Sequence, residues 1–159
     1  MSNAMDERRA TIEEGKRRSE HETKARLENA ASRETMVTKA NADIALNRLG
    51  NAIDNLSRET TTLNACLGQR WTSGPAHIRS YCDLLLADSE DALRDSRLTL
   101  SAAQGFYATD PAKTCAICLN IQASAEYKAT GCQVAIGFLE LHGYITFGHL
   151  PAVGGHRGD

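Results

Sequence analysis

Two cysteines two residues apart are the first candidates for chemistry in this chain. Cys115 and Cys118 form a Cys-Ala-Ile-Cys motif, which has the spacing of a redox pair or of half a zinc site. A zinc site needs a second pair of ligands, but Cys66, Cys82 and Cys132 are scattered singly. A thioredoxin-like site needs a preceding strand, and the pattern shows none. We therefore expect Cys115 and Cys118 to be structural; a redox or metal protein is the least favoured reading.

The five histidines do not complete a catalytic site either. None lies in a recognisable nucleophile motif with a serine, cysteine or carboxylate partner. Residues 143–158 are rich in glycine but lack the strand, turn and helix that make a phosphate-binding loop. The sequence therefore predicts a protein that is not an enzyme and that needs no cofactor or metal.

Cys66 and Cys82 lie on either side of a break between two predicted helices. Cys66 ends the first helix and Cys82 lies in the first turns of the second, so a helical hairpin would bring both to the same end. A disulfide bond between them is one expectation, in an oxidising compartment. Burial as free thiols on a helical face is the alternative. The odd total of five cysteines leaves at least one thiol unpaired.

Composition limits the function classes further. The net charge of -2 gives no overall basic field, so binding to nucleic acid is disfavoured. No apolar run reaches the roughly 18 residues of a membrane span, so membrane attachment is expected only if an anchor was removed. Residues 1–4 look like the remnant of an expression tag. Aromatic residues make up only 5% of the chain, and so thin a core usually needs self-association or a protein partner.

The elements that position these residues begin with one long helix, predicted over residues 5–67. Up to about residue 42 it carries charges of mixed sign, with pairs such as Glu13 and Arg17 at i,i+4, which suits an exposed helix. Beyond residue 46 an apolar seam follows steps of three and four. A coiled coil and the buried stripe of a single amphipathic helix explain this seam equally well, and both require a partner surface. The seam consists of Leu46, Leu49, Ile53, Leu56, Leu63 and Leu67.

Two shorter helices are predicted over residues 75–142. Gly68 to Pro75 breaks the first helix, with Ser73 or Gly74 as the cap of the next, and Pro111 starts the third. A short strand within residues 134–147 is an alternative, and residues 143–159 read as a flexible tail. The fold class expected is all-α, with the long helix followed by an antiparallel helical bundle or hairpin.

The second helix is expected to return antiparallel along the first, because the loop is short and both helices carry an apolar stripe. In that alignment Leu56 faces residues 85–89. A collinear rod, in which each helix pairs with another chain, is the competing arrangement.

The layout of residues 5–118 resembles phage lysis proteins of the inner-membrane spanin type and related prophage proteins. The residues that carry the resemblance are the seam ending in Leu63-Asn64-Ala65-Cys66-Leu67 and the helix start Tyr81-Cys82-Asp83-Leu84-Leu85-Leu86-Ala87-Asp88. The resemblance implies a periplasmic helical protein that meets an outer-membrane lipoprotein and acts mechanically on the envelope during host lysis. Two departures are the missing N-terminal membrane anchor and residues 131–159, which have no counterpart. The alternative function is a cytoplasmic oligomeric adaptor or regulator that associates through the seam.

Overall fold

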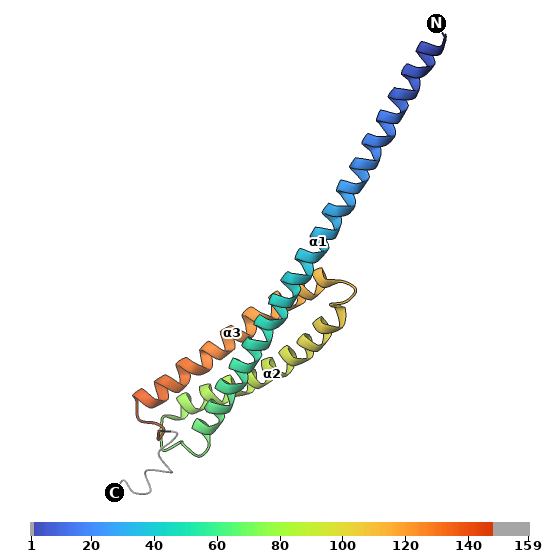
Figure 1. Cartoon of the computed structure of the whole chain (residues 1–159). Coiled ribbons are helices and arrows are strands. Elements are labelled where there is room, and N and C mark those ends of the chain that lie inside the picture. Colours follow the sequence, from blue (N-terminus) through green and yellow to red (C-terminus); the bar gives the residue numbers. More distant parts are fainter. Residues whose placement is uncertain (1, 148–159) are drawn as a thin grey trace. The chain divides into compact units, whose positions relative to one another are not determined.

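The computed structural model describes residues 2–147, and this part of the chain is built from three α-helices (Figure 1). Helix α1 spans Ser2–Leu67, α2 spans Ala76–Phe106 and α3 spans Pro111–Leu141. Among the described residues the only β pairing is an isolated bridge between Trp71 and Ile145. The prediction of an all-α fold is therefore confirmed, and the alternative of a short strand within residues 134–147 is wrong for the part described.

Local signals explain where the helices begin and end. The backbone N–H of Gly68 donates to the carbonyl of Asn64 at 3.0 Å, which closes the last turn of α1. Helix α3 begins with Pro111 in its first turn, and the Asp110 side chain accepts a hydrogen bond from the backbone N–H of Lys113. Helix α2 departs from expectation, since Pro75 itself is the N-cap and no side chain caps it. The predicted cap at Ser73 or Gly74 is therefore wrong.

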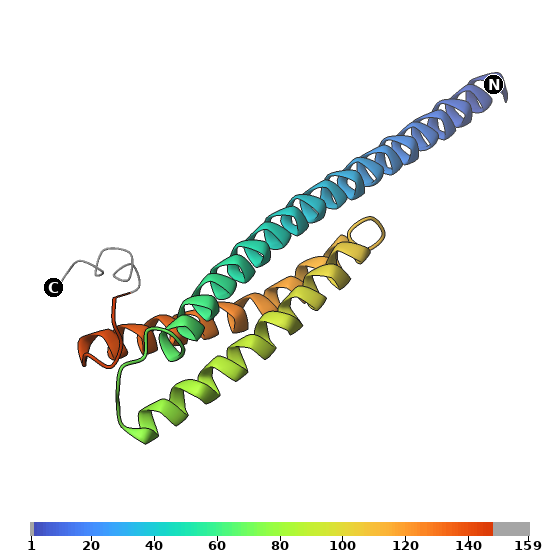
Figure 2. The same cartoon turned by 90° about the horizontal axis from the view of Figure 1, so that it is seen from below.

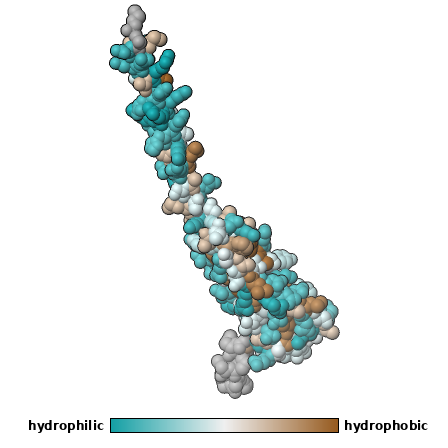
Figure 3. Space-filling model, turned by 90° about the vertical axis from the view of Figure 1, so that its right-hand side faces the viewer, coloured by the Kyte–Doolittle hydropathy of each residue, from teal (hydrophilic) through white to brown (hydrophobic). Residues whose placement is uncertain are grey.

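The chain divides into two compact units, Met1–Ala40 and Asn41–Asp159. In the first unit the side chains of residues 3–37 are all exposed. Figure 3 shows a mainly hydrophilic surface over this helix, with isolated hydrophobic side chains. The ion pair between Arg17 and Glu14 at 3.2 Å is exposed and adds only a few tenths of a kcal/mol. Propensity and such pairs therefore carry this helix.

The second unit is a three-helix bundle formed by residues 41–67 of α1 together with α2 and α3. Figure 2 shows α2 and α3 side by side. Arg97 of α2 donates to the hydroxyl of Ser57 at 3.3 Å, and Asp43 near the start of the bundle raises the pKa of Tyr107, the residue that follows α2. Helix α2 is therefore antiparallel to α1, as expected for a hairpin within one chain.

The register between α1 and α2 differs from the prediction. Residue 57 lies beside Arg97, whereas the expected alignment placed Leu56 opposite residues 85–89. The physical reason is that α2 must also fit α3, which the alignment of two helices ignored. Ser89, for example, accepts a hydrogen bond from the thiol of Cys132 on α3 at 3.2 Å.

The core of the bundle has two buried clusters. The first surrounds Leu49 and Leu56 near the middle of the bundle, and the second surrounds Leu63 and Leu139 at the end where α1 stops. Many of the other buried residues are alanine, cysteine or serine. Thr114 also fits into this core by donating to the carbonyl of Ala103 at 2.8 Å, which ties the start of α3 to the end of α2. Small side chains thus let the helices approach closely.

Residues 143–147 correct the expected flexible tail. Gly143 has a φ of 70°, and the chain then turns so that the N–H of Tyr144 donates to the carbonyl of Leu139 at 3.0 Å. Thr146 donates from its backbone N–H to the carbonyl of Arg70 at 2.8 Å. Ile145 is buried in the second cluster. The tail prediction is therefore wrong for residues 143–147, and residues 148–159 lie outside the described residues.

Within the described part of the chain, no helix combines the length and the apolar character that a membrane crossing requires.

Candidate functional site: the groove between α2 and α3

The predicted interaction seam faces the inside of the bundle. Leu49, Leu56 and Leu63 are fully buried, Ile53 and Leu67 nearly so, and Leu46 is partly buried. Helices α2 and α3 of the same chain cover these side chains. In this structure the seam is therefore the buried stripe of an amphipathic helix, which is one of the two interpretations of the sequence. A surface for another molecule has to lie elsewhere on the bundle.

Cys66 and Cys82 share the second core cluster, as their predicted positions at one end of a hairpin suggested, but both are free thiols. The expected disulfide bond is therefore not formed in this structure. Burial raises the pKa of each thiol above its ordinary value, and at Cys66 the nearby Arg70 partly opposes that effect. The Arg70 guanidinium donates to the Cys66 sulfur at 3.3 Å.

Arg70 holds this end of the bundle together. Its Nε donates to the carbonyl of Thr146 at 2.7 Å, and its Nη2 lies 3.4 Å from a carboxylate oxygen of Glu140. Next to it, Trp71 packs on Tyr144, with 6.5 Å between the ring centroids, and the guanidinium of Arg79 lies 4.9 Å from the Trp71 ring centre. The contacts of Arg70 and Trp71 close the bundle end and do not form an open site.

The Cys115-Ala-Ile-Cys118 motif lies along α3, with Cys118 buried in the core and Cys115 half-buried beside it. Burial raises the pKa of Cys118. The same cause raises the pKa of Cys132, which lies about four turns further along α3. Among residues 2–147, no group of three or more histidine, cysteine or acidic side chains is placed to hold a metal ion. Cys118 and Cys132 are core side chains, and Cys115 packs against the core while half-buried.

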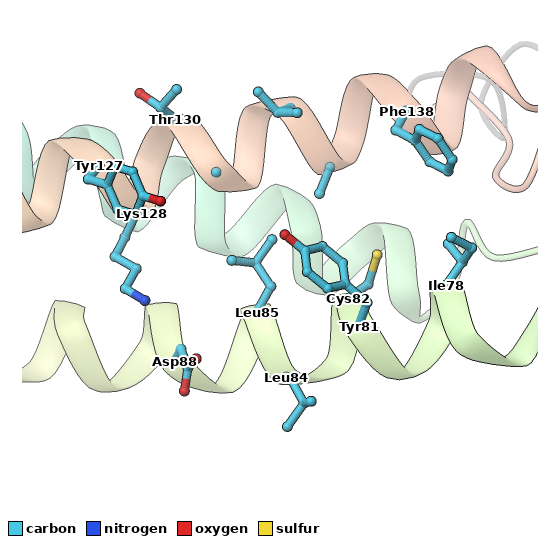
Figure 4. Close-up of a pocket in the computed structure, with 13 residues that line it drawn as sticks. Ile78, Tyr81, Cys82, Leu84, Leu85, Asp88, Tyr127, Lys128, Thr130 and Phe138 are labelled. Atoms are coloured by element: carbon cyan, nitrogen blue, oxygen red, sulfur yellow. The ribbon is translucent and has the colours of Figure 1, made fainter.

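An open groove of about 700 Å³ lies between α2 and α3. Figure 4 shows its lining, with Ile78 and Phe138 toward one end and Asp88 and Lys128 toward the other. Most of the lining is apolar or aromatic. The large lining side chains are Ile78, Tyr81, Leu84 and Leu85 from α2, and Tyr127, Val134 and Phe138 from α3.

Gly131 explains why a hollow exists at this point. It lies on α3 among the lining residues and has no side chain, so the space between the two helices stays open. A Cβ atom at residue 131 would meet Leu85 Cδ1 at 3.6 Å, which is an ordinary van der Waals contact. Leu85 therefore forms the floor below Gly131, and the bulky Tyr81 and Tyr127 stand on the two walls.

The sequence interpretation missed this groove. It expected one apolar stripe on α2 to face the first helix, but it did not identify Tyr81 and Val134 as parts of an exposed surface. A signal was present, because α2 and α3 carry more large apolar side chains than one buried stripe can use. Tyr81, Leu84 and Leu98 on α2 remain exposed, and so do Leu119, Tyr127 and Val134 on α3.

Residues 41–147 thus define the class of the protein as a three-helix bundle with an exposed apolar groove. No protein-family model matches the chain, and no curated protein or solved structure matches it either.

Proposed function

We propose that this chain is a non-enzymatic interaction or scaffolding protein that binds a helical segment in the groove between α2 and α3. The observation that carries the proposal is the exposure of large apolar side chains along the groove. Tyr127 is 78% exposed, Val134 67% and Tyr81 62%. A contiguous apolar surface of this kind marks an interaction site in many proteins.

The shape of the groove favours a helix as the bound segment. Two adjacent antiparallel helices form a groove along their length, and an amphipathic helix can bind in such a groove through its apolar face. Gly131 opens the middle of the groove and allows a close approach, since helices pack at about 8–10 Å between axes. The apolar part reaches from Ile78 to Leu85 on α2, which is long enough for about two helical turns.

The test is binding of a designed, fluorescein-labelled amphipathic helical peptide with a leucine face and a neutral polar face, followed by fluorescence anisotropy. We expect saturable binding that the double variant Tyr81→Asp, Val134→Asp weakens at least tenfold, because two carboxylates would be buried against leucine. The matched control is Leu119→Asp, which changes an exposed leucine of α3 outside the groove. Circular dichroism checks that each variant folds. Equal binding by the groove variant and the control would contradict the proposal.

The mechanical role in host lysis that the spanin resemblance implies stays a prediction, as does the alternative of a cytoplasmic adaptor. A groove that binds a helix is compatible with both. The neighbouring genes separate them, because adjacent endolysin and holin genes are expected for a lysis protein. Their absence would count against the lysis role and leave the adaptor.

A further inference from the structure

The helix of residues 2–40 has an apolar stripe on which none of the described residues packs. Met5, Ile12, Leu27 and Val37 are exposed, and they follow one another at roughly two, four and three turns, so they lie on one side of the helix. We call these four residues the N-terminal stripe. A helix that is exposed all round has only propensity and weak side-chain pairs to stabilise it. A surface that covered the stripe would therefore stabilise this segment.

The charges next to the N-terminal stripe are mainly basic. At about 100° per residue, Arg8, Arg9, Lys16 and Arg26 lie within about 60° of the middle of the stripe, and Glu34 is the single acid in that range. Most of the other acids of residues 2–40 point to the opposite side of the helix. The stripe is therefore apolar with basic edges.

The groove has the opposite charge beside it. The row of α2 that carries Tyr81 continues at steps of four and three to Asp88, Asp91 and Asp95, all exposed. Arg94 pairs with Asp91 at 2.8 Å and neutralises part of this charge. Lys128 of α3 also lines the groove at the Asp88 end, so three acids lie beside two bases and the net charge next to the apolar groove is negative.

We propose that the groove between α2 and α3 takes the N-terminal stripe of a second copy of this chain. The inference rests on the proposed function, since it names the occupant of the same groove. The apolar part of the groove is about two turns long, so Met5 and Ile12, which are two turns apart, would cover Tyr81 and Val134, and the basic side chains beside them would face the acidic row of α2. Complementary charge of this kind sets which surfaces pair and in which orientation.

The experiment is sedimentation velocity of the full chain over a range of concentrations. We expect concentration-dependent association of the native chain. The groove variant Tyr81→Asp, Val134→Asp and the stripe variant Met5→Asp, Ile12→Asp should each weaken it at least tenfold. Met5 and Ile12 are exposed, so the stripe variant keeps the bundle intact. The control Leu119→Asp should associate like the native chain.

Mixing the two variants gives the decisive result. The groove variant keeps a native stripe and the stripe variant keeps a native groove, so an equimolar mixture should recover one contact and form heterodimers. A stripe variant that associates as the native chain does, or a mixture that stays monomeric, would overturn the proposal, because the contact would then not join stripe to groove.

Charge exchange tests the orientation of the contact. Arg8→Glu, Arg9→Glu, Lys16→Glu in one copy should abolish association, and mixing that copy with Asp88→Lys, Asp91→Lys, Asp95→Lys in another should restore it. A native chain that stays monomeric at every concentration overturns this inference. If the neutral peptide still binds the groove in that case, the proposed function stands. If the peptide does not bind either, the proposed function and this inference are both wrong.

Discussion

Gly131 offers the sharpest perturbation of the groove, because a side chain there would enter the hollow while the helix around it stays the same. The change Gly131→Ala adds a Cβ atom 3.6 Å from Leu85 Cδ1, which is ordinary contact and requires no movement. Gly137 is the matched control, since it lies in the same helix with nothing within 4 Å of its added Cβ and does not line the groove.

Both alanine variants should stabilise the bundle by about 0.5–1 kcal/mol, because glycine inside a helix costs about that much relative to alanine. For a bundle of this size the gain corresponds to a rise of roughly 2–4 °C in Tm. Gly131→Leu goes further, since its side chain would occupy the space that a bound helix needs. We expect it to weaken peptide binding at least tenfold, while Gly137→Leu leaves binding unchanged.

The assay combines thermal unfolding, followed by the fluorescence of Trp71, with the anisotropy titration of the labelled peptide. Trp71 is the only tryptophan and packs at the closed end of the bundle, so its signal reports the bundle itself. A Gly131→Leu variant that binds the peptide with native affinity would refute the placement of the peptide in the groove. A fall in Tm for Gly131→Ala beside a rise for Gly137→Ala would show that α2 and α3 are closer than described.

Three further outcomes follow from the core and the closed end. Leu56→Ala should lose about 2–5 kcal/mol of unfolding free energy in urea, because Leu56 is fully buried, whereas exposed Leu98→Ala should change it by less than about 0.5 kcal/mol. Arg70→Met should lose about 1–3 kcal/mol and shift the Trp71 emission, since it removes the bonds to Thr146 and Glu140. Burial raises the pKa of the Cys66 thiol in the folded protein. The stability that this thiol contributes is therefore complete below its unfolded pKa of about 8.5 and is lost as the pH rises toward the folded pKa. We expect the urea midpoint of unfolding to fall between about pH 8 and pH 10, and to fall less steeply in Cys66→Ala.

The helices and their breaks could be predicted because local residues specify them. Asp110 and Pro111 cap and start α3, and Gly68 ends α1, through contacts within a few residues of each. The burial of the seam followed from its three-four spacing, since Leu49, Leu56 and Leu63 share one side of α1 whichever surface covers them.

The register and the packed residues 143–147 could not be predicted in the same way. Both depend on three partners at once: Ser89 of α2 meets Cys132 of α3, and Arg70 of the loop holds Thr146 after α3. Residues 143–147 consist of one glycine followed by four β-formers, and this pattern alone does not separate a packed turn from a mobile tail. The contact of Ile145 with the bundle end decides the outcome, and no local signal encodes it.

The groove follows from an unusual division of side chains on α2. Apart from Leu93, the fully enclosed residues of this helix are small, namely Cys82, Ser89, Ser96 and Ala103, while the large Tyr81, Leu84 and Leu98 are exposed. Small side chains let α2 approach α1 and α3 closely. The bundle is then stabilised by many close van der Waals contacts and not by the burial of large side chains of α2. The large apolar side chains stay in water in the bundle alone. Burying their surface would contribute about 25 cal/mol for each Å² removed from water. Helix α2 therefore buries its row of small side chains and exposes its row of large ones. The exposed row can be buried only by another molecule, and the groove beside Tyr81 is where a helical segment would bind.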